Sequence, residues 1–188
     1  MPAYADNPDE YFDTYTREGK PLGPVKRSIV HAEGIWHKAV NVLLYRTSGA
    51  LVIQQRAAQK SVCPLAWDLS VAEHLQVSES WESAAMRGLQ EELGVEHINL
   101  TQCGGELMEQ FDLHLGQQQI HNYEFQRCYQ GVTDAPIRVD PIEVKSVREI
   151  SLTELMHQMH SEPQQFTPWF VRWAHELKLF QGTSETGQ

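Results

Sequence analysis

The sequence predicts an α/β fold in which a mixed β-sheet is sandwiched between α-helices, and three features carry this prediction. Residues 36–56 have the apolar composition of paired core strands. Residues 80–93 have the periodicity of an amphipathic helix, and further strands at 105–150 precede helices near the C-terminus. Strands on both sides of a central helix, with helices at the end, are typical of a sheet covered on both faces.

The length and charge of the chain limit its organisation and its partners. Its 188 residues are too few for two ordinary domains of roughly 150 residues each, so we expect one domain at 11–180 with tails at 1–10 and 181–188. The formal net charge of −10 argues against a nucleic acid polymer or a membrane surface as partner. No apolar stretch approaches the roughly 20 residues of a membrane span, and the acidic N-terminus is unlike a signal peptide. Three cysteines without CxxC spacing fit a reducing compartment, so we expect a cytoplasmic protein.

The first expected elements are short. Residues 10–16 favour a strand, residues 17–23 a turn with two glycines and a proline, and residues 28–32 a helical turn. Two core strands at 36–45 and 50–56 should form a hairpin, because β-branched and aliphatic residues flank a turn that contains glycine.

A short strand at 66–72 should end at Glu73 and His74 and lead into the amphipathic helix. Apolar residues at i, i+4 steps share one face of that helix: Trp81, Ala85, Leu89 and Leu93. Gly94 stops the helix. Gly88 in its interior costs about 1 kcal/mol relative to alanine, so another interaction must hold this turn.

Three further strands are expected, at 105–115, 120–129 and 143–150. Residues 116–119 should join the first two. Ser151 and Glu154 have capping-box spacing at the start of the next helix, and Pro168 leads into a tryptophan-rich last helix at 169–180.

Acidic residues cluster between the short strand and the end of the amphipathic helix: Glu73, Glu79, Glu82, Glu91 and Glu92. Arg87 lies one turn before Glu91. The residues alone leave two interpretations open. One is a solvated helix face, whose i, i+4 ion pair contributes about 0.2–0.5 kcal/mol. The other is a set of converging carboxylates that bind Mg²⁺, a cation that prefers oxygen ligands and bridges substrate phosphates.

The order and spacing of these residues resemble the Nudix box, G-x5-E-x7-R-E-U-x-E-E-x-G-U, in which U is aliphatic. Seven of the nine defined positions match: Glu79, Arg87, Leu89, Glu91, Glu92, Gly94 and Val95. The strand pair, the segment before the box and the aromatic segment near the C-terminus look like the branch that includes type I isopentenyl diphosphate isomerases. The resemblance covers roughly residues 11–178 and implies a Nudix fold.

The same resemblance implies metal-dependent cleavage of a nucleoside diphosphate-X or another small organic diphosphate, with Mg²⁺ or Mn²⁺ as cofactor. Glu91 and Glu92 correspond to metal ligands, and Glu91 also belongs to the catalytic set. Arg87 would orient a carboxylate through charge-assisted hydrogen bonds, and Glu79 would support the site. Homodimers are common in the family, so a homodimer stays an open alternative.

Two positions depart from the box. Gly88 replaces the glutamate that in many members binds metal and acts as general base, and Glu73 replaces the opening glycine. The two substitutions are complementary, because the chain gains a glutamate at position 73 and lacks one at position 88. The space left by the missing side chain at Gly88 would admit the carboxylate of Glu73. Glu73 is therefore a candidate catalytic residue. The alternative is a relaxed site in a Nudix-fold protein that binds a diphosphate with little or no turnover.

Three histidines resemble part of the metal site of the isomerases: His31, His37 and His74. We expect His74 to be a metal ligand together with Glu124, whose strand would cross beside the box helix. For His31 and His37 the spacing favours a surface or hydrogen-bonding role.

Other positions argue against isomerase activity. The isomerases require a cysteine two residues before the last of these histidines and a Glu-x-Glu pair on a later strand. This chain has Ala72 at the first place and Asn122 and Glu124 at the second, which makes an isomerase the third choice. Glu143, at the start of a strand, is a candidate remote base, and a plain surface role there is the alternative.

Overall fold

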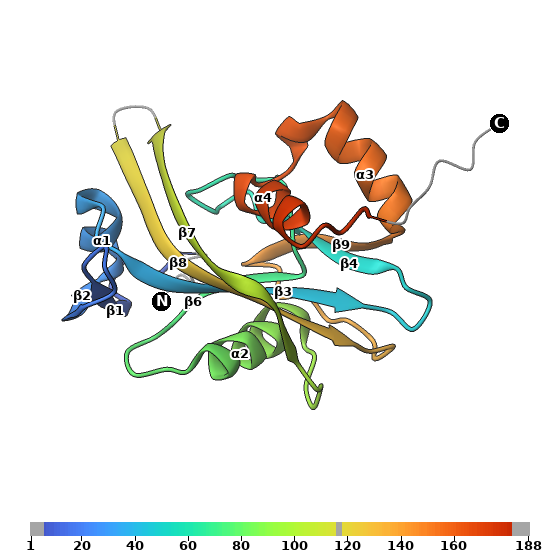
Figure 1. Ribbon diagram of the computed structural model, residues 1–188, viewed down its shortest axis with the longest axis horizontal. Coiled ribbons are helices and arrows are strands. Elements are labelled where there is room, and N and C mark those ends of the chain that lie inside the picture. The colour runs from blue at the N-terminus through green and yellow to red at the C-terminus, as the bar shows by residue number, and fades with distance from the viewer. Residues whose placement is uncertain (1–5, 116–117, 182–188) are drawn as a thin grey trace.

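The computed structural model describes residues 6–115 and 118–181, and a seven-stranded mixed β-sheet forms its centre (Figure 1). The main path of the sheet runs β5-β4-β3-β8-β7, with β6 paired to β3 and β9 paired to β4. Its strands are β3 (His37–Tyr45), β4 (Leu51–Arg56), β5 (Trp67–Asp68), β6 (Val71–His74), β7 (Thr101–Leu115), β8 (Gln118–Val132) and β9 (Val144–Ile150). β3 and β8 pair in parallel, and the other pairs of this sheet are antiparallel.

Helices cover both faces of the sheet, as the sequence predicts. In Figure 1, α2 (Trp81–Leu93) lies on one face, and α3 (Leu152–Ser161) and α4 (Pro168–Glu176) lie on the other. A short 3₁₀ helix, η1 (Pro163–Gln165), joins α3 to α4. Alternate residues of β3 enter two separate cores, because successive side chains of a strand point to opposite faces. Val42 packs in the core under α2, and Leu43 packs in the core under α3 and α4.

A smaller unit flanks the sheet. β1 (Tyr11–Tyr15) and β2 (Pro21–Lys26) form a two-stranded antiparallel sheet, and α1 (Arg27–Glu33) follows directly. The turn expected at 17–23 is therefore shorter than predicted, because its last residues pair with β1.

The close approach of α2 to β6 explains the glycine in the middle of the helix. Ser80 caps α2 by accepting a hydrogen bond from the backbone N–H of Ser83, and Gly94 ends it with φ 64°. A Cβ atom on Gly88 would lie 2.6 Å from Cγ1 of Val71, which is closer than carbon atoms pack. Packing against β6 thus holds the turn that helix propensity disfavours.

Two expected strands have different bounds. The strand predicted at 66–72 is divided into β5 and β6, because the Ser70 hydroxyl between them bonds to the backbone of β3 and β4. β7 begins at Thr101 rather than at 105. It pairs with β8 on both sides of a register irregularity between Cys103 and Leu107, which contains two glycines.

The tails predicted at the two ends lie partly outside the described residues, which omit 1–5 and 182–188, and residues 116–117 of the predicted turn are outside them too. Residues 6–10, which belong to the predicted N-terminal tail, make backbone hydrogen bonds to the start of α1. The backbone N–H of Arg27 donates to the carbonyl of Glu10, and that of Ser28 donates to the carbonyl of Pro8. Among the described residues, no helix has the length and apolarity needed to cross a bilayer.

Candidate active site

A cavity of about 860 Å³ opens where β6, β8, α1 and the end of α2 meet. Charged and polar side chains from distant parts of the sequence line it, among them His31, Glu73, His74, Glu92 and Glu124. β6 supplies two neighbouring members of this set. β6 pairs with β3, and β3 pairs with β8. The sheet therefore brings His74 of β6 next to Glu124 of β8 at one edge of the cavity.

Arg87 on α2 organises the carboxylates beside this cavity. Its guanidinium makes a bidentate contact with Glu79, with Nε–Oε1 and Nη2–Oε2 distances of 2.9 Å each. Nη1 lies 3.3 Å from Oε2 of Glu73 and 3.2 Å from Oε2 of Glu91, and Nη2 donates to the carbonyl of His74 at 2.8 Å. The planar donor set of arginine fixes several acceptors at once. Arg87 therefore contacts Glu73, Glu79 and Glu91 at once.

Glu79 completes this support. Its Oε2 also accepts a hydrogen bond from the backbone N–H of Gln76 at 2.8 Å, which fixes the loop between β6 and α2. Both carboxylate oxygens of Glu79 are thus engaged within the protein.

Two carboxyl groups line the cavity together, that of Glu73, which is partly buried, and that of Glu92, which is buried. Their side chains belong to β6 and α2, and Glu92 accepts a hydrogen bond from Nε2 of Gln54 at 2.6 Å. Burial raises the pKa of Glu92, and the charge of Glu73 raises it further. Burial also raises the pKa of Glu73, although Arg87 opposes this rise. Two such carboxylates favour a bound cation, because a cation would compensate charge that burial penalises.

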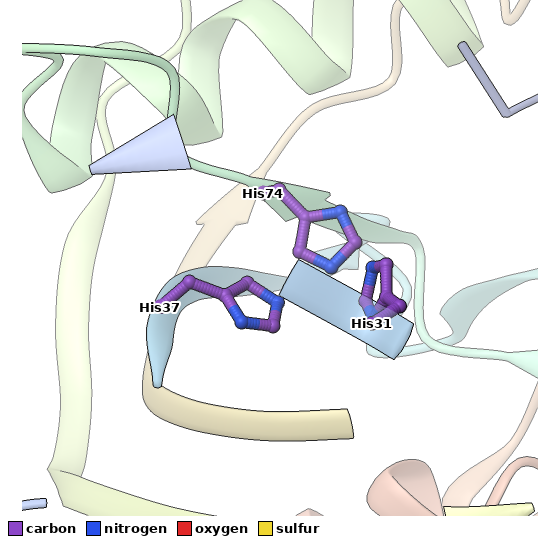
Figure 2. Close-up of side chains that lie close together, drawn as sticks. All are labelled: His31, His37 and His74. Atoms are coloured by element: carbon purple, nitrogen blue, oxygen red, sulfur yellow. The ribbon is translucent and has the colours of Figure 1, made fainter. Parts of the chain in front are cut away.

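Three histidines gather beside the cavity, which His31 and His74 line, and Figure 2 shows their rings turned toward one another. Their nitrogen ligand atoms all lie within 4.8 Å of one another. Burial lowers the pKa of His74 well below its usual value and lowers that of His31 to about 4. Both rings are therefore neutral near pH 7, which is the protonation state that binds metals.

The hydrogen bonds of His37 leave one nitrogen for a ligand. Its Nδ1 is 3.0 Å from the carbonyl of Ile35, and since a carbonyl only accepts, Nδ1 carries the proton. Within the described part of the chain, the buried Nε2 has no hydrogen-bond partner, and Oε1 of Glu124 lies 3.6 Å away. A cation placed between Nε2 of His37 and the carboxylate of Glu124 would give that nitrogen a partner and balance the charge of the carboxylate. The donor set thus fits a divalent metal ion.

Glu124 connects the histidines to the sheet. Its Oε1 lies 3.0 Å from Nε2 of His74, and its Oε2 accepts a hydrogen bond from Gln126 at 2.6 Å. Burial alone would raise the pKa of Glu124, but the imidazoles of His37 and His74 outweigh burial and lower it well below its usual value. Glu124 is consequently ionised and carries the negative charge of this cluster.

A family model described as NUDIX domain matches residues 35–170. The chain belongs to the Nudix family. The predicted Nudix fold, and the predicted likeness to the isopentenyl diphosphate isomerase-like branch, are confirmed.

Known proteins resemble this Nudix protein over most of their length. The isopentenyl-diphosphate Delta-isomerase of Nocardia farcinica is 34% identical over 154 residues, which are 81% of this chain and 86% of that protein. The structure of DR0079 from Deinococcus radiodurans matches with a TM-score of 0.64 and 23% identity, over 81% of this chain and 90% of that one. The structure of the dihydroneopterin triphosphate pyrophosphohydrolase of E. coli matches with a TM-score of 0.53 and 17% identity, over 77% of this chain and 92% of that one. At these identities the two structures show the fold alone.

The structure separates the Nudix-box residues that the sequence groups together. Among the described residues that line the cavity, Glu92 is present, whereas Glu91 and Glu143 are not. The Glu91 side chain is 57% exposed and pairs with Arg87 on the outer side of α2. Glu143 forms an ion pair with Lys60, which does line the cavity.

The histidine cluster and its surroundings show what sequence reasoning missed. Of the surface or hydrogen-bonding role expected for His37, the structure shows a hydrogen bond from a fully buried ring, and it places this ring beside His31 and His74. Gln54 was not among the candidates. A signal for it existed, because two glutamines interrupt the apolar run of β4, and Gln54 is only 3% exposed.

Proposed function

We propose that this Nudix protein is a metal-dependent hydrolase that cleaves the diphosphate linkage of a nucleoside diphosphate-X or a related small organic diphosphate. The observation that carries the proposal is the position of Glu73 and Glu92, whose carboxyl groups line a cavity large enough for such a substrate. Cavities of about 300–1,000 Å³ are typical of small-molecule sites.

Two groups of residues would hold divalent cations. Glu73 and Glu92 offer the oxygen ligands that Mg²⁺ or Mn²⁺ prefers. The histidine cluster with Glu124 offers nitrogen ligands, which suit a transition metal. Such ions, when bound, neutralise phosphate oxygens and lower the pKa of water.

The protein side chains supply positioning and proton transfer. Basic side chains that line the cavity, Arg27, Arg56 and Lys60, match the charge of phosphate groups. Arg87 orients Glu73, and a carboxyl group whose pKa is raised toward neutrality is suited to take a proton from water. Glu73 is thus our candidate general base. It would take over the role of the glutamate that many relatives have at the position of Gly88.

Isomerase activity is the second candidate, because the relative from Nocardia farcinica carries that name and because the three histidines and Glu124 lie together. One residue argues against it. Ala72 lines the cavity two positions before His74, and a methyl group has no proton to transfer to or from a carbon atom.

A substrate panel tests the proposal. The purified protein is incubated with Mg²⁺ or Mn²⁺ and nucleoside diphosphate sugars, dinucleoside polyphosphates or prenyl diphosphates, and phosphate-containing products are separated by anion exchange. Metal-dependent cleavage of one class supports the hydrolase. Conversion of isopentenyl diphosphate to its isomer, followed by proton NMR, supports the second candidate. Tight binding without turnover of any compound would leave a diphosphate-binding protein and would overturn the hydrolase.

A further inference from the structure

An internal carboxylate occupies a basic cradle at the edge of the cavity. Oδ1 of Asp6 lies 2.7 Å from Nη2 of Arg27 and 3.8 Å from Nζ of Lys60. Oδ2 of Asp6 accepts hydrogen bonds from both the backbone N–H and the hydroxyl of Ser61, at 2.7 and 2.5 Å. All four residues line the cavity that contains Glu73 and Glu92. One carboxylate near the N-terminus therefore uses donors that come from two other segments of the chain, at residue 27 and at residues 60–61.

The cradle has the properties of a built anion site. The side chains of Asp6, Arg27 and Lys60 are 14%, 16% and 13% exposed, so water screens their charges weakly. Burial alone would raise the pKa of Asp6, but Arg27, Lys60 and the hydrogen bonds from Ser61 outweigh burial and lower it. Asp6 is an anion at every pH at which the protein would be assayed.

Other acidic side chains share the two cations without filling the cradle. Glu10 lies 3.3 Å from Nη1 of Arg27, and Glu143 pairs with Lys60. Both hydrogen-bond donors of Ser61 converge on Asp6, and within the described part of the chain neither Glu10 nor Glu143 accepts a hydrogen bond from Ser61. Asp6 is therefore the carboxylate that is bound by both Arg27 and Ser61.

We propose that Asp6 is an internal ligand that competes with a phosphate group of the substrate for Arg27, Lys60 and Ser61, so that the N-terminal segment restrains the site. This inference rests on the proposed function, because the competing ligand is a phosphate of the same diphosphate substrate. A phosphate offers more acceptor oxygens and a larger charge than a carboxylate, so it can use the same donors more fully. The apparent affinity for phosphate compounds is reduced by the fraction of molecules in which Asp6 occupies the cradle.

The test compares Asp6→Asn with a matched control, Asp9→Asn. Asp9 pairs with Lys26 on the surface, where its side chain is 75% exposed. Binding of inorganic pyrophosphate is measured by calorimetry without metal, so the result does not depend on catalysis. We expect Asp6→Asn to bind pyrophosphate about fivefold to tenfold more tightly than the wild type, and Asp9→Asn to bind like the wild type.

A second readout distinguishes competition from loss of a structural contact. Asp6→Asn leaves Arg27 and Lys60 with less opposing charge, so its melting temperature should fall, and pyrophosphate should raise it more than it raises that of the wild type. Asp6→Ala should behave in the same way. Adding Arg27→Gln to Asp6→Asn should abolish the gain in affinity.

Two outcomes would overturn the inference. Unchanged or weaker pyrophosphate binding by both Asp6 variants would make Asp6 a structural residue only. A gain that persists after Arg27→Gln would place the anion elsewhere. Failure of the proposed function would look different, because an absence of turnover would leave the difference in pyrophosphate affinity intact.

Discussion

The side chain of Glu73 packs against Gly88 and, together with Val71, occupies space that a residue larger than glycine would need at position 88. A Cβ atom on Gly88 would lie 3.2 Å from Cβ of Glu73 and 3.5 Å from its Cγ. The two departures from the Nudix box are therefore coupled by packing. The carboxyl group of Glu73 reaches the cavity from β6, whereas the glutamate absent at 88 would have come from α2.

Exchange of these two residues tests whether Glu73 serves the reaction. Glu73→Gly should lower the hydrolysis rate at least tenfold without lowering the melting temperature by more than a few degrees, because general-base catalysis contributes about 10²–10⁴ in rate. Gly88→Glu alone should be destabilised by about 1–3 kcal/mol, because it overpacks the contact with Val71 and Glu73. Initial rates and urea unfolding measure both effects.

The double variant, Glu73→Gly with Gly88→Glu, supplies the comparison. It restores the common box and removes one of the two close contacts, so it should be more stable than Gly88→Glu. If Glu73→Gly keeps the wild-type rate while the double variant gains activity, the wild-type site has decayed and Glu73 is not its base.

Metal binding should depend on Glu92 more than on Glu91. Glu92 lines the cavity and is 5% exposed, whereas Glu91 points outward and pairs with Arg87. Glu92→Gln should weaken Mg²⁺ binding about tenfold or more, since it removes a buried ligand charge, and Glu91→Gln should have a smaller effect. Calorimetric titration with Mg²⁺ measures both. An unchanged affinity in the double variant would show that the metal binds elsewhere.

Replacement of His37 should remove the nitrogen-rich site. Co²⁺ added to the metal-free wild type should give visible absorption bands of a histidine-ligated ion, and His37→Gln should lose them, because Nε2 of His37 faces the cluster without a partner among the described residues. His97→Gln is the matched control, since that side chain is 94% exposed. Equal spectra for all three proteins would contradict this prediction.

The metal-free protein should lose stability as pH rises, through Glu92. Burial, followed by the charge of Glu73, raises the pKa of Glu92 to about 8 from 4.5. Between these values the folded state holds a proton that the unfolded state releases. The contribution of this group is therefore complete below pH 4.5 and is lost as pH rises toward 8.

Glu92→Gln isolates that contribution, because glutamine resembles the protonated carboxyl group. The melting temperature of the variant should exceed that of the metal-free wild type by an increasing margin between pH 5 and pH 8. Glu82→Gln, on the exposed face of α2, is the matched control for the loss of one carboxylate. A constant margin for Glu92→Gln would mean that Glu92 is ionised throughout this range.

Local patterns in the sequence were sufficient to predict most secondary-structure elements. The strands that became β3 and β4, the helix α2 with its stop at Gly94, and the capping of α3 by Ser151 all depend on residues a few positions apart. Their periodicity and caps are encoded locally, so they can be recognised without knowledge of the tertiary structure. The spacing of the Nudix box is local in the same sense, and it identified the family.

Tertiary structure decided which side chains meet. Glu91 and Glu92 are neighbours in sequence, but successive helix residues point in directions about 100° apart, and only the docking of α2 on β3 and β6 determined that Glu92 faces the cavity. His37 and Glu124 come together because β3 and β8 pair in parallel with these two residues in register. Asp6 reaches Ser61 across 55 positions. Such contacts depend on how the helices and strands pack in the two cores on either side of the sheet. The free energy of that packing comes from residues far apart in the sequence, so no local pattern reveals it.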